Sequence, residues 1–244
     1  MIKSEYQNMY EAENSYWWYV SLHKIIESFV SKTINKPGIR IFDAGCGTGR
    51  TLEILSKYGY SEGIDYEPSA IEFAKKRNLK NIYCADLNTW KNTDNKFDYI
   101  ISSDVISNAG ITDDKKVFEN LYSSLNSGGY LILNLPAFKI LFRKHDKAVF
   151  GLRRYRRKEL NNILKQSGFQ IYRSTYRYPF LFFVLLLKKF IEKFSDDKNV
   201  ESDLKKSSGF VNKCMTALIS GENFFIRCGI SFPLGSSVFV VAKK

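Results

Sequence analysis

The sequence is poor in the residues that build metal centres and disulfide frameworks. Its 244 residues include only 2 histidines and 4 cysteines, and no two cysteines are spaced as C-x-x-C. The N-terminus is polar and acidic and does not read as a signal peptide. These features argue against a metal cluster and predict a cytoplasmic protein with reduced thiols.

Long apolar runs are also missing. The run from Phe180 to Leu187 is far shorter than the roughly 20 residues that a membrane-spanning helix needs. With 44% hydrophobic and 25% charged residues, the composition is that of an ordinary globular protein, which excludes disordered and fibrous classes. A chain of this length can bury the core of one large α/β domain.

Positive charge is concentrated in one segment. Residues 139–213 carry 19 basic and 7 acidic side chains, a surplus equal to the net charge of +12, and the rest of the chain is neutral. A segregated surplus predicts an anionic partner, such as a phosphate-bearing substrate, a lipid surface or nucleic acid.

The most informative stretch is Ile39 to Gly49, with the sequence IRIFDAGCGTG. An apolar run ends in Asp43, and glycines follow at alternate positions, Gly45, Gly47 and Gly49. This pattern predicts a buried strand that ends in a turn without Cβ atoms, where backbone N–H groups can approach a ligand. A dinucleotide fold would show G-x-G-x-x-G, with its third glycine one residue further on.

Three more carboxylates follow predicted strands. Asp65 ends the next apolar strand about twenty residues on, where a ribose-binding carboxylate belongs. Asp86 follows the strand after that, and Asp104 the fourth. Because ligands of a doubly wound sheet bind beyond the carboxyl ends of its strands, these side chains are expected around one site.

Strands and helices alternate from residue 39 onwards, which predicts a parallel, doubly wound sheet. The expected strands are 39–44, 61–65, 81–85, 97–102, 130–135, 169–175 and 237–242. The expected helices are 48–58, 68–77, 113–125, 157–167, 179–194 and 210–226, preceded by an N-terminal helix within 6–32.

The pattern D-x-G-x-G-x-G resembles the first motif of class I S-adenosylmethionine-dependent methyltransferases. Further motifs resemble a bacterial and archaeal subgroup of these enzymes with an HD...RRY motif, over residues 10–180. They are Phe97-Asp98-Tyr99-Ile100, Ser103-Asp104-Val105, Asn126-Ser127-Gly128-Gly129, Leu135-Pro136-Ala137, His145-Asp146, Gly151, Arg153-Arg154-Tyr155, Glu159-Leu160 and Gly168-Phe169. One departure is Ser107-Asn108. At these two positions the family usually has an acidic or apolar residue followed by His.

The resemblance implies S-adenosylmethionine as cofactor, with S-adenosylhomocysteine as product. Asp43 and the glycine backbone would hold its methionine part, Asp65 both ribose hydroxyls, and Asp86 the adenine amine. The other residues that the resemblance places at the cofactor are Tyr66, Leu87, Asp104 and Trp17.

The resemblance also implies a Rossmann-like, seven-stranded, mostly parallel sheet whose last strand is antiparallel. Residues 1–36 would form an N-terminal helical cover, 37–177 and 236–244 the methyltransferase core, and 178–235 a helical insertion or cap. Within the insertion, Ser195 to Ser208 reads as a polar, mobile connection. The N-terminal aromatic residues, Trp17 among them, either close the cofactor pocket or simply pack.

Four residues are candidates for the acceptor side. His145 could act as a general base oriented by Asp146, or the pair could merely fasten a loop. Arg154, next to Arg153, and Tyr155 could bind a carboxylate or phosphate, or could be surface residues at a helix start.

These features favour O-methylation of a small-molecule or lipid-linked, anionic acceptor. Nucleic acid is disfavoured because the residues after the fourth strand lack the Asn/Asp-Pro-Pro-aromatic motif of base-amine methylation, although an RNA methyltransferase stays an alternative. A non-catalytic S-adenosylmethionine-binding module and a dehydrogenase are the others. The helix 179–194 could lie on an anionic membrane, be covered by 210–226, or form a homodimer contact.

Overall fold

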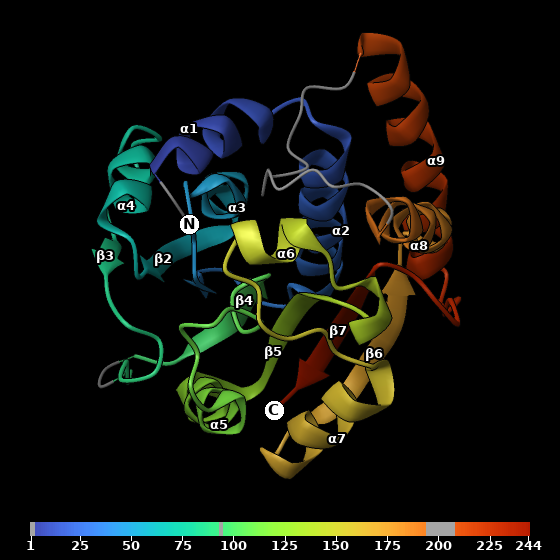
Figure 1. Ribbon diagram of the computed structural model, residues 1–244. Coiled ribbons are helices and arrows are strands. Elements are labelled where there is room, and N and C mark those ends of the chain that lie inside the picture. Colours follow the sequence, from blue (N-terminus) through green and yellow to red (C-terminus); the bar gives the residue numbers. More distant parts are fainter. Residues whose placement is uncertain (1–2, 93–94, 194–207) are drawn as a thin grey trace.

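The computed structural model describes residues 3–92, 95–193 and 208–244 (Figure 1). At its centre lies a seven-stranded sheet with the strand order β3-β2-β1-β4-β5-β7-β6. The strands are β1 (Ile39–Ala44), β2 (Gly59–Asp65), β3 (Ile82–Cys84), β4 (Phe97–Ser103), β5 (Leu125–Pro136), β6 (Gln170–Arg177) and β7 (Ser237–Lys243). Strands β1 to β5 pair in parallel, whereas β7 runs antiparallel to β5 and β6. The predicted Rossmann-like sheet with an antiparallel last strand is confirmed.

Helices cover both faces of the sheet. On one face α5 and α7 pack through residues such as Phe118 and Leu164, and on the other α2, α3, α4 and α9 contribute Ile26, Leu52 and Ile226. The helices are α1 (Lys3–Ala12), α2 (Trp17–Thr33), α3 (Arg50–Leu55), η1 (Ser56–Tyr58), α4 (Pro68–Lys75), α5 (Asp114–Ser124), η2 (Lys139–Leu141), α6 (Lys144–Ala148), α7 (Arg157–Gln166), α8 (Pro179–Lys193) and α9 (Gly209–Arg227). None of these described helices is both long and apolar enough to cross a membrane.

Two parts of the chain differ from the predicted elements. The N-terminal segment forms two helices, α1 and α2, because the turn at residues 13–15 directs the Glu13 side chain inward and contains Asn14 and Ser15, which are weak helix formers. The short helices η2 and α6 were not predicted, since three to five residues are too few to show a helical period.

The insertion between β6 and β7 contains the two predicted helices, α8 and α9. Helix α9 packs along α2, and Asn223 Nδ2 donates a hydrogen bond to the Ser21 carbonyl oxygen over 2.8 Å. The insertion is therefore fastened to the core through α9. The polar connection predicted at Ser195 to Ser208 lies outside the described residues except for Ser208, which caps α9 through Val211 N–H.

Candidate functional site

The glycine loop between β1 and α3 has the conformation that its sequence predicts. Gly45, Gly47 and Gly49 have positive φ angles of 95°, 53° and 83°. A Cβ atom at Gly45 would overlap with the side chain of Val105, the residue that follows Asp104. The loop therefore needs glycine, and it borders the carboxyl end of β4.

Asp65 closes this loop from β2. Its Oδ2 accepts a hydrogen bond from Gly47 N–H over 2.9 Å, and its Oδ1 accepts one from Glu67 N–H over 3.0 Å. Burial raises the pKa of this carboxyl, although the two backbone hydrogen bonds oppose the rise. The Tyr6 hydroxyl also lies against this carboxylate, which with about four lone-pair sites can still accept from a ligand hydroxyl.

Two further acidic groups lie near Asp65. Asp43, at the end of β1, is fully enclosed, and burial together with the negative charges of Asp65 and Glu13 raises its pKa to about 8. Burial raises the pKa of Glu13 to about 7, against the hydrogen bonds from Thr48 and Arg77. Such a concentration of carboxyl groups favours a cationic ligand over a neutral one.

The predicted cofactor residues that follow β2 and β3 occupy different positions. Asp86 Oδ1 accepts from the backbone N–H and side-chain amide of Asn88 over 2.9 and 2.7 Å. Leu87 is buried in the apolar core, whereas Tyr66 is 73% exposed. Of these three predicted cofactor residues, Asp86 is the acidic one, and it lies just beyond the carboxyl end of β3.

Asp104 lies at the end of β4, beside the loop. Its backbone adopts the sparsely populated left-handed region, with φ of 59°, and its N–H donates to the Asn134 carbonyl oxygen over 2.8 Å. The Asn134 amide donates to its Oδ2 over 3.3 Å. Burial raises the pKa of Asp104 to about 7, while this amide and the charges of Arg154 and Arg177 lower it.

Three of the predicted acceptor residues, Asp146, Arg154 and Tyr155, make hydrogen bonds within the protein. Arg154 Nε and Nη2 donate to the Asp146 carboxylate over 2.8 and 3.1 Å, and Nη1 donates to the Ala137 carbonyl oxygen. Both side chains are buried. Tyr155 is also buried, and its hydroxyl donates to Asp114 over 2.8 Å. The arginine fork predicted for an anionic acceptor is thus already filled within the protein.

The Asp146 carboxylate also accepts from Arg143 N–H over 2.8 Å, which closes the first turn of α6. These contacts give Asp146 a structural role, the alternative left open from the sequence, although its partners Arg154 and Arg143 were not predicted. His145 lies in the same helix and is partly exposed.

Trp17 is the first residue of α2, and its side chain packs towards α9. Its ring contacts Tyr178 edge to face, with centroids 6.0 Å apart, and it belongs to a small apolar cluster with Ile219. Its backbone N–H donates to Asn212 Oδ1 over 2.8 Å. These contacts correspond to the packing role left open from the sequence.

Comparisons with known proteins identify the family. A family model described as a methyltransferase domain matches residues 35–176, more than half of the chain. The chain belongs to this family. The predicted class, S-adenosylmethionine-dependent methyltransferase, is thereby confirmed.

The relatives of this methyltransferase share only part of their length with it. Phosphoethanolamine N-methyltransferase 1 of Zea mays is 33% identical over 115 residues, which are 44% of this chain and 23% of the relative. Probable tRNA methyltransferase 9B of Mus musculus is 31% identical over 113 residues, 46% of this chain and 25% of the relative. The match therefore spans about a quarter of these proteins.

The fold similarity extends further. An S-adenosylmethionine-dependent methyltransferase structure from Mesorhizobium loti superimposes with a TM-score of 0.58 at 16% identity, covering 89% of this chain and 96% of the other. At this identity the likeness concerns the fold alone.

S-adenosylmethionine, the cofactor of this class, fits the residues present. The loop offers a backbone cradle without Cβ atoms, the Asp65 carboxylate can accept further hydrogen bonds, and Asp43 and Glu13, once ionised, would add negative potential for a cationic sulfonium. Asp65 would hold the ribose, and Asp86 the adenine amine.

Helix α1, in the segment expected to form an N-terminal cover, lies over this cradle through residues that the sequence did not single out. In Figure 1 it runs from α4 towards α2. Met9 lies against Gly47, where a Cβ would stand 2.6 Å from its Cε, and Tyr6 is buried beside Asp65. The contacts join residues almost 40 to 60 positions apart, so no local pattern reveals them.

A second group missed from the sequence lies at the carboxyl ends of β4, β5 and β6. Ser103 Oγ, Asn134 Oδ1 and Arg177 Nη1 are buried and have no hydrogen-bond partner among the described residues. Ser103 pairs with Asn134, and the register through β7 puts Arg177 on the same face. Unsatisfied buried groups of this kind are expected where a polar ligand binds.

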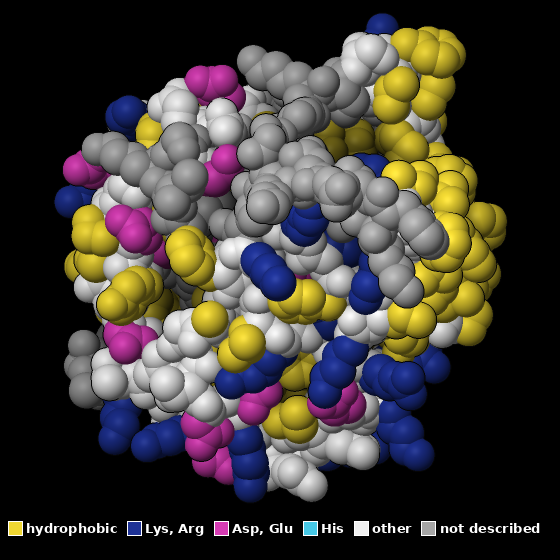
Figure 2. Space-filling model, viewed as in Figure 1, with side chains coloured by type: hydrophobic (Ala, Val, Ile, Leu, Met, Phe, Trp, Pro, Cys, Tyr) yellow, Lys and Arg dark blue, Asp and Glu magenta, His cyan; other side chains and the backbone are white. Residues whose placement is uncertain are grey.

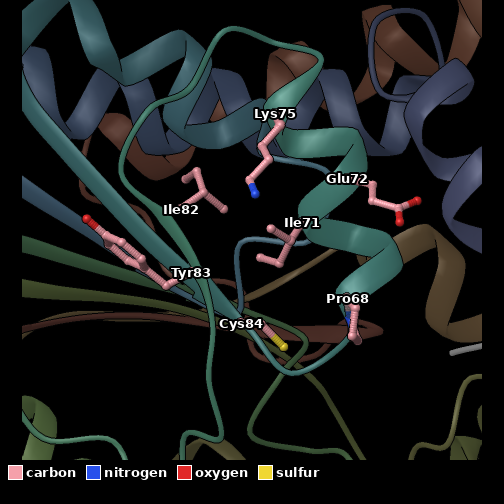
Figure 3. A pocket seen from close by; sticks show the side chains of 7 residues that line it. All are labelled: Pro68, Ile71, Glu72, Lys75, Ile82, Tyr83 and Cys84. Atoms are coloured by element: carbon pink, nitrogen blue, oxygen red, sulfur yellow. The ribbon is translucent and has the colours of Figure 1, made fainter.

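A hollow of about 490 Å³ lies between α4 and the edge strand β3 (Figure 3). None of the predicted cofactor residues lines it. It is bounded by Pro68, Ile71, Glu72, Lys75, Ile82, Tyr83 and Cys84.

Proposed function

We propose that this methyltransferase methylates an anionic acceptor, either a small molecule or a lipid-linked one, with oxygen as the favoured nucleophile. The observation that carries the proposal is the position of Asp104. Its neighbour Val105 lies against the glycine loop, and its carboxylate is near enough to Arg177 and to the Arg154–Asp146 pair for their charges to act on its pKa. A nucleophile held there would be flanked by the cofactor cradle on one side and by cations on the other.

Asp104 is suited to take the proton of an acceptor hydroxyl. S-adenosylmethionine supplies an activated methyl group when bound, so the protein needs chiefly to align the acceptor and remove its proton. A pKa of about 7 leaves Asp104 partly ionised at neutral pH, which is where a general base is most effective. The Asn134 amide would fix the orientation of its carboxylate. His145 is the other candidate base.

The negative charge of the acceptor is supported by Arg177. This side chain is fully buried, and of its three guanidinium nitrogens Nη2 alone makes a hydrogen bond with a described residue, Asn223 Oδ1 at 3.2 Å. Glu222 Oε1 stands 3.8 Å from Nε, too far for a hydrogen bond. An acceptor carboxylate or phosphate would satisfy the remaining donors.

The insertion is proposed to lie on an anionic membrane surface. Figure 2 shows hydrophobic side chains gathered over α8 and α9, with Lys and Arg side chains beside them. On α8 the exposed members are Phe180, Phe183, Leu187, Phe190 and Ile191. Apolar side chains that enter the headgroup region next to cations are typical of interfacial helices.

Co-sedimentation with vesicles of phosphatidylglycerol and phosphatidylcholine tests this contact. Phe183→Glu should abolish binding, because Phe183 is 59% exposed, whereas Phe182 packs on Phe138 with centroids 5.3 Å apart and its replacement would disturb the fold. Tyr83→Glu, on the distant edge strand, is the matched control. A protein that stays in the supernatant at low salt, or that forms a dimer through this face by sedimentation velocity, would refute the membrane contact.

The acceptor class is tested with methyl-labelled S-adenosylmethionine and a cell extract separated into lipid, small-molecule and RNA fractions. Label should enter an anionic product in the lipid or small-molecule fraction. Asp104→Asn should reduce this transfer by roughly 10²-fold or more while S-adenosylhomocysteine still binds. Label in RNA would favour the rival acceptor, and cofactor binding without any transfer would favour a non-catalytic module.

A further inference from the structure

A groove of about 520 Å³ runs between the η2–α6 segment and α8. Half of its lining is apolar and half is basic. The apolar residues are Ile140, Phe142, Leu186 and Phe190, and the basic ones are Arg143, Lys144, Lys147 and Lys189. Among the described residues that line it, none is acidic.

A hydrogen bond links the two walls of the groove. Lys189 Nζ, from α8, donates a hydrogen bond to the carbonyl oxygen of Ile140 over 2.8 Å. The side chains of Ile140 and Phe190 are more than half exposed. Soluble proteins normally bury apolar surface of this kind. An exposed apolar patch that is bordered by charged residues indicates a binding site.

The groove is continuous with the outer face of α8. Leu186 and Phe190 line it, while Phe183 and Leu187 of the same helix point to the exposed apolar surface. On its other side the groove reaches Arg143, whose backbone N–H is bound by Asp146 at the start of α6. It thus extends from the proposed membrane contact to the helix that carries His145.

We propose that this groove binds one anionic lipid, with its acyl chain along the apolar wall and its phosphate among the cations. A purely apolar ligand would gain nothing from the positive charge of the lining, and a free phosphate would gain nothing from Leu186 and Phe190. The volume is within the range of small-molecule sites. That the lipid is also the methyl acceptor, or carries it, rests on the proposed function, whereas its binding does not.

Isothermal titration of the full chain, without cofactor, tests the groove. The probe is decanoyl lysophosphatidic acid below its micellar concentration, compared with decanoylglycerol, which lacks the phosphate, and glycerol 3-phosphate, which lacks the chain. Because each lysine near an anionic headgroup contributes about a few-fold in affinity, the probe should bind roughly tenfold or more tightly than either comparison compound.

Three variants locate the site. Leu186→Trp should block the groove, and Lys147→Gln with Lys189→Gln should weaken binding of the probe by roughly tenfold. Lys188→Gln, on the same helix but outside the lining, is the matched control and should bind normally. Circular dichroism and melting temperature establish that each variant is folded.

The outcomes separate the groove from its surroundings. Phe183→Glu should lose vesicle binding and keep the monomeric probe, since Phe183 does not line the groove. Equal affinity for decanoylglycerol and for the probe would overturn the proposal. A loss of probe affinity in Lys188→Gln as large as in the groove variants would do the same. Probe binding by a chain that methylates no anionic acceptor would support the groove and count against the proposed function alone.

Discussion

Glu13 and Arg77 form a buried ion pair, with Arg77 Nη2 2.9 Å from Glu13 Oε2. Glu13 also accepts a hydrogen bond from the Thr48 hydroxyl in the glycine loop, and Arg77 Nε donates to the Thr48 carbonyl oxygen over 2.9 Å. The pair therefore fastens the turn between α1 and α2 to the loop that α1 covers.

Glu13→Ala should destabilise the protein and weaken the cofactor site together. It leaves a buried guanidinium with only Glu53 as a charged partner among the described residues, and breaking a buried pair costs about 3 kcal/mol or more. Urea denaturation measures the loss. Glu27→Ala, which removes the exposed ion pair with Lys57, is the control and should cost under about 1 kcal/mol. A similar small loss in both variants would contradict the role of Glu13.

The stability of the cofactor-free protein should fall as pH rises from about 6.5 to 8.5. Burial raises the folded-state pKa of Asp43 to about 8 and that of Asp104 to about 7, so the folded state holds protons that the unfolded state has already lost. The loss should be on the order of 2 kcal/mol. Below this range His23 acts oppositely, because burial lowers its pKa to about 3.

Denaturation curves at four or five pH values would measure this slope, and Asp43→Asn should flatten it. Stability that rises across the same range would show that these carboxyl groups are ionised in the folded protein. Affinity for S-adenosylmethionine should rise with pH more steeply than affinity for S-adenosylhomocysteine, because only the former carries a sulfonium charge.

Asp65→Ala should largely abolish cofactor binding. It removes two acceptors for the ribose and also the hydrogen bond that holds Gly47 N–H, at a cost of roughly 2 to 5 kcal/mol in binding. Calorimetry with S-adenosylhomocysteine provides the measurement. Glu62→Ala, in the same strand and away from the loop, serves as control, and unchanged affinity in Asp65→Ala would remove Asp65 from the ribose site.

Arg154→Ala and His145→Ala should behave differently. The first leaves Asp146 buried without its ion-pair partner and should cost about 3 kcal/mol of stability or more. The second removes a partly exposed side chain and should cost about 0.5 kcal/mol or less. If His145→Ala keeps its cofactor affinity yet loses turnover, His145 becomes the base in place of Asp104.

The sequence alone determined the fold and the end of the sheet at which the cofactor binds. The alternate glycines after Asp43 indicated a turn with positive φ angles, and strand periodicity put Asp65, Asp86 and Asp104 at the carboxyl ends of β2, β3 and β4, on either side of β1. These features are local, because they depend on the spacing of residues along one strand or turn. The helices α8 and α9 were equally visible as apolar helical runs.

The tertiary structure decided which charged groups meet. From the sequence, Arg154 and Tyr155 were expected to bind the methyl acceptor. Folding buries both side chains, and because buried polar groups must be paired, they hydrogen-bond to Asp146 and Asp114. Glu13 gained its role from residues 35 and 64 positions away, and Arg177 lost solvent without gaining a full set of acceptors. Pairings of this kind depend on how layers pack in space, and no periodic signal along the chain encodes them.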